Sequence, residues 1–371
     1  MESRKQAREA RLAGSMALAL AGCAMELPTS DRILDERPLA IRVEALADPA
    51  RAEVLPLERV RLRPWIVTPQ GPLDAARVEQ EFEPLWLACS LPPRVGLFGC
   101  LSSHLPLDAA AIPLCPEPDL AALDPAALAD AAPPSPCRIT PAPAAEPEYT
   151  IPIDPAFLIG GDVEVTMIAH RPGRGTSEGC LQALVSRADG ISEDCLFANQ
   201  RITIGPSSAI YQAAAALGIT LGPPPPETEP DTHPRILNFT IDAYLGDRRI
   251  GTPVTLSQPG GTLELPPGVR LELTTQAPAS DLQTFYTTGD AGVWDEQSEA
   301  YTGRWFCTWG TLASPQSDDP TSFNRWELVP DDQDTSEFPP GGRATLFYVL
   351  RDGRQGVTWW WFDVQVTAST E

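Results

Sequence analysis

The chain has 371 residues, with 50 acidic and 27 basic side chains and a formal net charge of −23 at pH 7. Such acidity argues against nucleic acid as a partner and against electrostatic docking on anionic lipid, because both carry negative charge. The 41 prolines and 27 glycines argue against a mainly helical protein, since proline removes a backbone donor and glycine favours turns.

The N-terminus has the three parts of a secretory signal: basic side chains, an apolar run over residues 12–21, and small residues before Cys23. The apolar run is too short to span a bilayer as a helix. Leu20-Ala21-Gly22-Cys23 resembles a bacterial lipobox, which implies that the Cys23 thiol receives a diacylglyceryl group and that the chain is cut before Cys23. The alternative is a cytosolic helix from Arg4 to about Met25 with a buried cysteine.

The lipobox resemblance implies a signal peptide over residues 1–22 and a lipid-anchored polar tether over residues 23–35. Ala24 follows the cysteine, so the aspartate that commonly retains lipoproteins in the inner membrane is absent. We therefore expect a protein held in the outer membrane by the lipid on Cys23, either periplasmic or surface-exposed. Residues 1–22 carry a net charge of +2, so the processed chain is near −25.

Residues 36–205 show the alternation of apolar and polar residues that predicts strands with one buried face. Strands are expected near residues 39–44, 60–67, 85–88, 149–151, 163–168 and 196–204. Pro64 lies where the alternation changes phase, which indicates an edge strand or a bulge. Residues 90–147 are rich in proline and alanine and break the pattern, so we interpret them as an insertion in this domain.

Six cysteines are clustered in the first domain, and a chain that is exported predicts disulfides among them. They are Cys89, Cys100, Cys115, Cys137, Cys180 and Cys195. Sequence alone does not choose the connectivity, although Cys180 with Cys195 is the favoured pair because the two flank one short segment. Cys307 stands apart between Trp305 and Trp309, and we expect it to be a buried free thiol.

Residues 206–233 are predicted to join the two domains. Ser207 to Leu217 is the one clear helix in the pattern, with an alanine run inside and Gly218 after it. Four consecutive prolines at 223–226 predict a stiff polyproline spacer up to His233. Residues 234–368 then show short strands separated by Pro/Gly turns, which favours a β-sandwich.

This second domain resembles an immunoglobulin-like or PKD-like module. The residues that carry the resemblance are Trp305-Phe306, Thr308 and Gly310, then Asn324, Trp326 and Pro330, and finally Val349 to Gly356 with Val357 and Trp359. With the lipobox, the chain is similar to a group of myxobacterial-type surface lipoproteins of unknown function. The resemblance covers the N-terminus and residues 234–368 and is weaker for residues 36–205. With the strand pattern, it predicts a mainly β protein with two immunoglobulin-like β-sandwich domains, joined by the proline-rich linker and with the Cys-rich insertion in the first. It brings no active site.

Three patterns in the sequence could indicate a catalytic or a metal-binding site. Gly175 to Gly179 fits the G-x-S-x-G pattern that exposes a serine in α/β-hydrolases, and Asp231 and His233 follow Ser177. No alternation of strands and helices surrounds the motif, so a Gly/Ser loop is the preferred interpretation. A zinc set of Cys89, Cys100, His104 and Cys115 lacks the short ligand pair usual in structural sites, and disulfides explain its cysteines better.

The acidic loop of Asp331, Asp332, Asp334 and Glu337 lacks the spacing of a calcium loop and is interpreted as a solvated turn. We therefore predict no catalytic residue, no metal site and no cofactor.

The last hairpin offers the candidate binding surface. Trp360 and Phe362 suit a core, which turns Trp359 and Trp361 to the opposite face, where a sandwich strand normally carries polar residues. Exposed tryptophans would form a platform for a glycan or a protein partner. The alternative is cover from within the chain, either by a loop of the same domain or by the helix at Ser207–Leu217.

The leading functional hypothesis is a lipid-anchored envelope protein with a non-catalytic binding or adhesion role, whose partner is an envelope protein or a glycan. One alternative is a structural or accessory subunit of an envelope complex. A second alternative is a surface hydrolase acting on glycans or esters, for which the 50 acidic residues nominate no particular pair.

Overall fold

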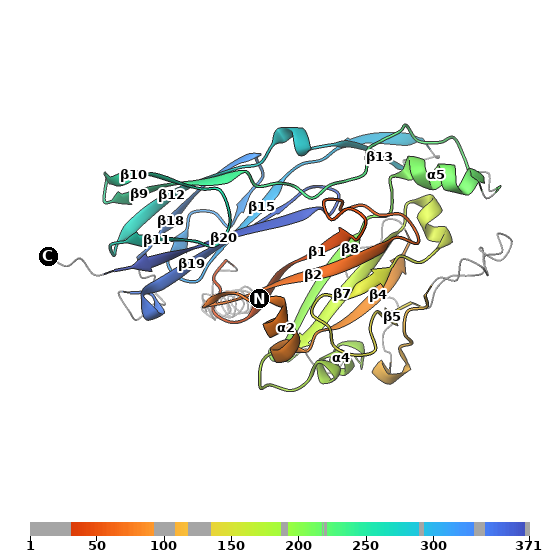
Figure 1. Ribbon diagram of the computed structural model, residues 1–371, viewed down its shortest axis with the longest axis horizontal. Coiled ribbons are helices and arrows are strands. Elements are labelled where there is room, and N and C mark those ends of the chain that lie inside the picture. Colours follow the sequence, from red (N-terminus) through yellow and green to blue (C-terminus); the bar gives the residue numbers. More distant parts are fainter. Residues whose placement is uncertain are drawn as a thin grey trace, which may run out of the picture.

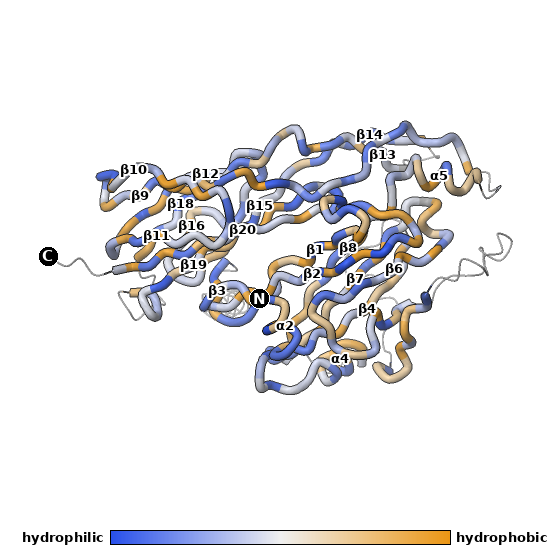
Figure 2. Tube along the Cα trace, viewed as in Figure 1, coloured by the Kyte–Doolittle hydropathy of each residue, from blue (hydrophilic) through white to orange (hydrophobic). Residues whose placement is uncertain are grey.

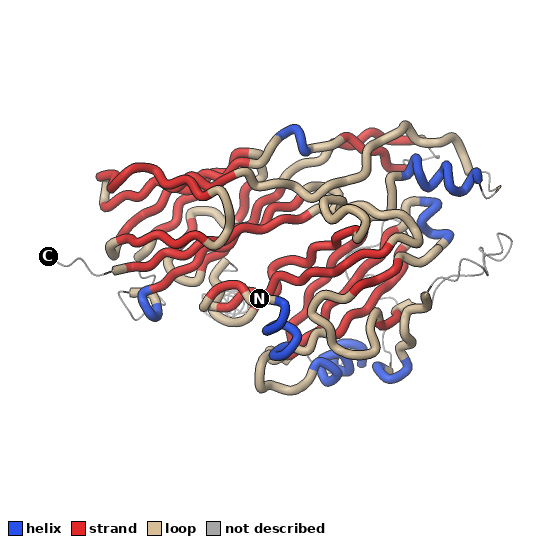
Figure 3. Tube along the Cα trace, viewed as in Figure 1, coloured by secondary structure: helices blue, strands red, loops and turns tan. Residues whose placement is uncertain are grey.

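The computed structural model describes residues 31–92, 108–117, 135–186, 192–216, 218, 221–288, 293–329 and 338–367. The described chain is mainly β, with several antiparallel sheets, as the sequence predicts (Figures 1 and 3). Its strands form two β-sandwiches, each with its own hydrophobic core. The immunoglobulin-like assignment of the two sandwiches stays a prediction.

The N-terminal sandwich consists of two antiparallel sheets. One contains β1 (Arg37–Ala45), β2 (Arg59–Thr68), β3 (Gly71–Pro72) and β6 (Glu148–Thr150). The other has the order β5 (Cys137–Arg138), β4 (Leu85–Leu91), β7 (Asp162–His170) and β8 (Cys195–Ile202). Ile41 and Leu62 from the first sheet and Trp86 and Val165 from the second lie in the same core, so the alternating residues of both sheets face each other.

The C-terminal sandwich is larger. One sheet has the order β10 (Arg248–Leu256), β9 (Asn238–Leu245), β12 (Val269–Gln276), β18 (Thr321–Glu327) and β16 (Thr311–Leu312). The other has the order β11 (Gly261–Leu265), β20 (Val357–Val366), β19 (Arg343–Arg351), β15 (Thr302–Cys307) and β17 (Gln316–Ser317). Only the pairing of β11 with β20 is parallel among the described pairs of this sandwich. Phe239, Trp305, Trp326 and Trp360 fill the space between the sheets.

A separate hairpin of β13 (Thr284–Thr288) and β14 (Trp294–Ser298) extends from the C-terminal sandwich to the side of the N-terminal one (Figure 1). Figure 2 shows hydrophobic colouring concentrated along the sandwich strands and paler or hydrophilic colouring over this hairpin. No described residue of this hairpin belongs to the core of either sandwich.

Three α-helices are described: α2 (Ala75–Phe82), α4 (Ser177–Ser186) and α5 (Ser207–Ala216). The prediction of a helix from Ser207 is confirmed by α5, and its last residue, Leu217, lies outside the described residues. Helices α2 and α4 were not predicted. Helix α2 is only two turns long and depends on local contacts that the hydrophobic pattern does not show. Asp74 accepts a hydrogen bond from the Arg77 amide at 2.9 Å, and Arg77 pairs with Glu81 one turn later.

Short 3₁₀ turns complete the described structure: η1 (Ala109–Ala111), η4 (Pro155–Ile159), η5 (Ala279–Asp281) and η7 (Pro340–Gly342). Only parts of the predicted insertion at 90–147 fall within the described residues. There, β5 joins the second sheet and Ala145 and Cys137 enter the N-terminal core, so these parts belong to the sandwich itself. No helix in the described ranges combines the length and the apolar character that a bilayer crossing requires.

The two sandwiches pack against each other through an apolar patch. Its residues come from β1, β2 and the segment before them on one side, and from β15, β19 and β20 on the other: Ile33, Leu39, Ala40, Trp65, Val67, Phe306, Phe347, Val349, Val357, Trp359 and Trp361. Trp359 stacks on Trp65 with ring centroids 5.3 Å apart and an interplanar angle of 7°. We call this set the apolar patch.

The apolar patch corrects the interpretation of Trp359 and Trp361 as an exposed platform. Both side chains are partly buried, and their cover comes from within the chain. Part of this cover was predicted, since Gly260, in a loop of the same sandwich, lies against Trp361. The rest was not, since β1 and β2 of the other sandwich pack on the two rings. The reason is that β1, β2, β19 and β20 all bury side chains on both faces, one toward their own core and one toward the neighbouring sandwich.

The linker prediction is also wrong in one respect. The end of the segment is packed against the N-terminal sandwich, because the His233 amide donates to Ala50 O at 2.8 Å and Asp231 O accepts from the Ala52 amide at 2.9 Å. Asp231 is fully buried and His233 is 6% exposed. The segment at 231–233 therefore lies in the interface between the sandwiches and does not act as a free spacer there.

Candidate functional site

The residues of the G-x-S-x-G motif do not form a catalytic site. Ser177 begins α4, is buried, and donates its hydroxyl hydrogen bond to Phe82 O at 2.9 Å. His233 has other partners for both ring nitrogens: Nε2 lies 2.9 Å from Val43 O, and Nδ1 accepts from the Val357 amide at 3.1 Å. Neither side chain is available to the other. The motif is the start of a structural helix, not the Gly/Ser loop that the sequence favoured.

The disulfide prediction is confirmed for two pairs, Cys115–Cys137 and the favoured pair Cys180–Cys195. Cys89 is disulfide-bonded as well, while Cys100 lies outside the described residues. The bond of Cys115 removes it from the alternative zinc set, whose member His104 is also outside the described residues. Cys307 is buried and forms no disulfide, as expected. Cys23 and the acidic loop from Asp331 to Glu337 lie outside the described residues too.

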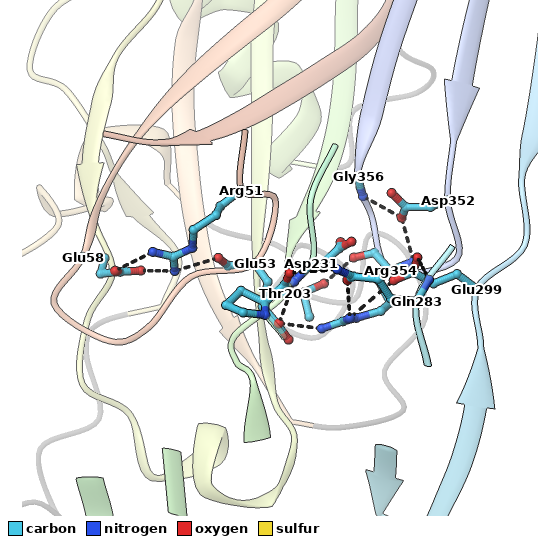
Figure 4. A network of polar contacts seen from close by, with 11 residues as sticks. Arg51, Glu53, Glu58, Thr203, Asp231, Gln283, Glu299, Asp352, Arg354 and Gly356 are labelled. Carbon is cyan, nitrogen blue, oxygen red and sulfur yellow. Dashed lines mark hydrogen bonds and ion pairs between the residues drawn. The ribbon is translucent and has the colours of Figure 1, made fainter. Parts of the chain in front are cut away.

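Charged side chains from three parts of the chain meet where the two sandwiches touch (Figure 4). Arg354, in the turn between β19 and β20, pairs with Glu53 of the N-terminal sandwich and with Glu299 of its own. Arg354 is 5% exposed, Glu53 4% and Glu299 6%. Glu53 also accepts from the Asp231 amide at 3.1 Å, which ties the linker to the same pair.

Asp352 is held by the backbone of its own turn. Its Oδ1 accepts from the amides of Arg354 at 2.9 Å and of Gly356 at 2.8 Å. A Cβ at position 356 would lie 2.0 Å from Asp352 Oδ2, so only glycine allows this close approach. We call Glu53, Asp231, Glu299, Asp352 and Arg354 the interface cluster. Thr203 and Gln200 extend it by hydrogen bonds to Arg354 O and to Gln355.

Burial changes the proton affinity of this cluster. Burial away from solvent, together with the nearby negative charge of Asp352, raises the pKa of Asp231 to about 9. Burial likewise raises the pKa of Asp352 to about 6 and raises that of Glu299. Burial lowers the pKa of His233 to about 3. At neutral pH, Asp231 and His233 are therefore both uncharged. The geometry of His233 also requires a neutral ring, because its Nδ1 accepts a hydrogen bond from the Val357 amide.

A cleft of about 830 Å³ opens beside the interface cluster. Its walls come from η4, β8 and α5 of the N-terminal sandwich, from linker residues 225–228, and from the β13–β14 hairpin of the C-terminal one. Glu53 and Arg354 form part of its lining. Five aromatic side chains line it as well: Phe157, Tyr211, Phe285, Tyr286 and Trp294. Such a volume is ordinary for a small-molecule site.

The aromatic wall is held in place by contacts across the cleft. Trp294 of β14 meets Tyr211 of α5 edge to face, with centroids 5.4 Å apart, and its indole N–H donates to Pro223 O at 2.8 Å. The Arg354 guanidinium lies 5.0 Å from the centre of the Phe285 ring. Asp162, Asp295 and Arg201 add charged groups to the lining, and burial raises the pKa of Asp162 to about 6. Among the described residues no cluster of three metal-ligating side chains is found.

Sequence reasoning missed both the cluster and the cleft, because their members come from distant segments without a motif. One signal was present. Arg351-Asp352-Gly353-Arg354 is a charged turn next to a strand that is apolar on both faces, and the proline segment carries Asp231 and His233. Charged residues beside such a strand indicate that another part of the protein with complementary charges packs there, although they do not identify which part.

The fold and the site define a class: a mainly β protein of two packed sandwiches with an aromatic, ligand-sized cleft between them. No protein-family model matches the chain, and no curated protein matches it. Among solved structures it is similar to the dimeric latent PorU from Porphyromonas gingivalis, with 12% sequence identity and a TM-score of 0.21. The match covers 94% of this chain and 25% of that chain. A TM-score this low supports no conclusion about function.

Proposed function

We propose that this chain is a lipid-anchored binding protein of the cell envelope and that the cleft between its two sandwiches holds the ligand. The observation that carries the proposal is the cleft of about 830 Å³, lined by five aromatic side chains and several charged ones. Aromatic faces pack on the apolar faces of sugar rings, while charged and amide groups accept and donate hydrogen bonds to hydroxyls. The ligand class that fits best is an envelope glycan of oligosaccharide size.

Because Trp359 and Trp361 are partly buried in the apolar patch, the cleft is the better candidate for an aromatic binding surface among the described residues. A lipid on Cys23 would keep this cleft at a membrane surface, close to the glycans of the envelope. The net charge of −23 is compatible with a neutral or cationic glycan and unfavourable for a strongly anionic one.

The test is a titration of the protein with soluble glycan fragments released from peptidoglycan, followed by calorimetry. We expect binding by the wild-type protein and a loss of at least tenfold in affinity for Trp294→Ala, which removes the largest ring of the cleft wall. The matched control is Phe323→Ala, because Phe323 is 56% exposed on the outer face of β18 and away from the cleft.

Equal affinities of the two variants would show that the cleft is not the site. If wild-type protein binds none of the fragments and instead co-purifies after crosslinking with one stoichiometric envelope protein, the glycan proposal is wrong and the subunit alternative is supported.

A further inference from the structure

One residue of the cleft lining has a strained backbone. Gln355 has a φ of 89°, a left-handed conformation that residues other than glycine seldom adopt. Among the described non-glycine residues with a positive φ, it is the one that lines the cleft, and it is exposed. Strain of this kind persists where surrounding contacts hold the backbone, and it is frequent at sites that clamp a ligand. The contacts of Gln355 therefore bear on what the cleft binds.

Both sandwiches hold the turn that carries Gln355. From the N-terminal sandwich, Thr203 Oγ1 donates to Arg354 O at 2.7 Å. Gln200 Nε2, from β8 of the same sandwich, donates to Gln355 O at 3.3 Å. Within the turn, Asp352 Oδ1 accepts two backbone amides, one of them from Arg354 at 2.9 Å. These contacts oppose the relaxation of Gln355 to an ordinary backbone conformation.

The hydrogen bonds also fix which way the Gln355 carboxamide faces. Gln200 Nε2 lies 3.0 Å from Arg201 O and 3.3 Å from Gln355 O, and both of these carbonyl oxygens can only accept. This end of Gln200 is therefore the amine, and the Gln355 atom 3.3 Å from it is the oxygen Oε1. The amine Nε2 of Gln355 donates to no group in the described part of the chain, so it is available to a ligand in the cleft.

The charge of the cleft limits the acceptor that this amine can meet. The lining has three acidic and two basic side chains: Glu53, Asp162, Asp295, Arg201 and Arg354. Arg354 is already paired with Glu53 and with Glu299. An anionic acceptor such as a phosphate or a carboxylate is therefore unfavourable in the cleft, and a neutral acceptor is favoured.

A glycan offers two kinds of strong neutral acceptor, the hydroxyl group and the carbonyl oxygen of an acetamido group. A hydroxyl also donates, so an acidic side chain of the lining can bind it without Gln355. An acetamido carbonyl oxygen only accepts and requires a donor such as the Gln355 carboxamide. The acetamido methyl adds an apolar surface, on which the aromatic lining can pack, including Phe285 beside Arg354.

We propose that Gln355 makes the cleft selective for N-acetylated amino sugars, by donating a hydrogen bond from Nε2 to the acetamido carbonyl oxygen. The inference rests on the proposed function and names the class of sugar that the cleft prefers. The strained turn and the hydrogen bond from Gln200 orient the carboxamide before the ligand arrives, which lowers the cost of binding. A sugar with a hydroxyl in place of the acetamido group lacks the acceptor and binds more weakly.

The experiment compares two trisaccharides by calorimetry, a trimer of N-acetylglucosamine and a trimer of glucose. We expect the wild-type protein to bind the N-acetylglucosamine trimer about tenfold more tightly, the contribution of one well-made hydrogen bond. Gln355→Glu keeps the length of the side chain and the acceptor for Gln200 but has no N–H donor. It should reduce the preference to about twofold or less, by losing affinity for the N-acetylglucosamine trimer.

Gln258→Glu is the matched control, because it makes the same change of charge at an exposed residue between β10 and β11, outside the cleft lining. It should keep the wild-type preference. Gln355→Gly separates binding from folding, since glycine adopts a positive φ without strain. This variant should lose the preference and unfold at a urea concentration no lower than the wild type.

Several outcomes would overturn the inference alone and leave the cleft as a glycan site. They are equal binding of the two trimers by the wild type, a full preference in Gln355→Glu, and an equal loss of affinity for both trimers in that variant. A Gln355→Gly protein that unfolds at lower urea would make the side chain a structural part of its turn, which also contradicts the assignment. A wild-type protein that binds neither trimer would overturn the proposed function as well.

Discussion

At the scale of single residues, the stacked pair of Trp65 and Trp359 ties the two sandwiches together. Replacing Trp359 and Trp361 with serine removes two large rings from the apolar patch, and truncation of buried aromatic side chains typically costs ~3–5 kcal/mol. We expect the double variant to lose ~3 kcal/mol or more of unfolding free energy in urea, because the rings are only partly buried.

Phe323→Ser is the control for this loss, since it removes an aromatic ring that is 56% exposed, and it should change stability little. A double variant as stable as the control would mean that the apolar patch contributes nothing to the fold.

The pattern of β20 predicted which of its side chains are unusual but not what covers them. Trp360 and Phe362 lie in the core of their sandwich, as the alternation indicates. The cover of Trp359 comes from Trp65, a residue in a different sandwich. No local rule links the two positions, because a strand with two apolar faces fits a loop, a helix or a second sheet equally well.

At the scale of elements, the Cys180–Cys195 disulfide fastens α4 to the first residue of β8, across 15 residues. A crosslink of this span restricts the unfolded chain and is worth ~3 kcal/mol on the loop-entropy estimate. We expect the double variant Cys180→Ala with Cys195→Ala to lose about that amount and to unfold at a lower temperature, measured by calorimetry.

Wild-type protein in reductant should lose at least as much, because reduction also opens Cys115–Cys137. An unchanged melting temperature in both samples would contradict a stabilising role for the disulfides.

Strands were the most predictable elements. Alternation near residues 39–44, 60–67 and 163–168 corresponds to β1, β2 and β7. On one edge of β2, β6 pairs with residues 59–61 and β3 pairs with residues 67–68. Pro64 lies between these two pairings, so its missing amide interrupts no ladder bond to either strand. Helices α2 and α4 escaped prediction because they are short and bury few apolar side chains: Val78 and Phe82 in α2, and Cys180, Leu181 and Val185 in α4.

At the scale of the whole molecule, the sequence predicted the β-rich architecture but not the packing of the two sandwiches. Four consecutive prolines do indicate a stiff segment. The buried position of Asp231 and His233 at its end depends on pairing with residues 50–52, and on the hydrogen bond that His233 Nδ1 accepts from the Val357 amide of the other sandwich. Charge clusters of this kind arise from tertiary structure alone, so the interface cluster could not be read from composition or spacing.

The attachment of the whole molecule is tested at Cys23. An acidic chain near −25 is repelled by anionic lipid, so the lipid on Cys23 is the expected means of attachment. The wild-type protein should therefore sediment with outer membranes and be released by detergent but not by high salt, whereas Cys23→Ala should appear in the soluble fraction. Ala24→Asp is the matched control, because it should remain membrane-bound and move to the inner membrane. Membrane retention of Cys23→Ala equal to that of the wild type would refute the lipid anchor.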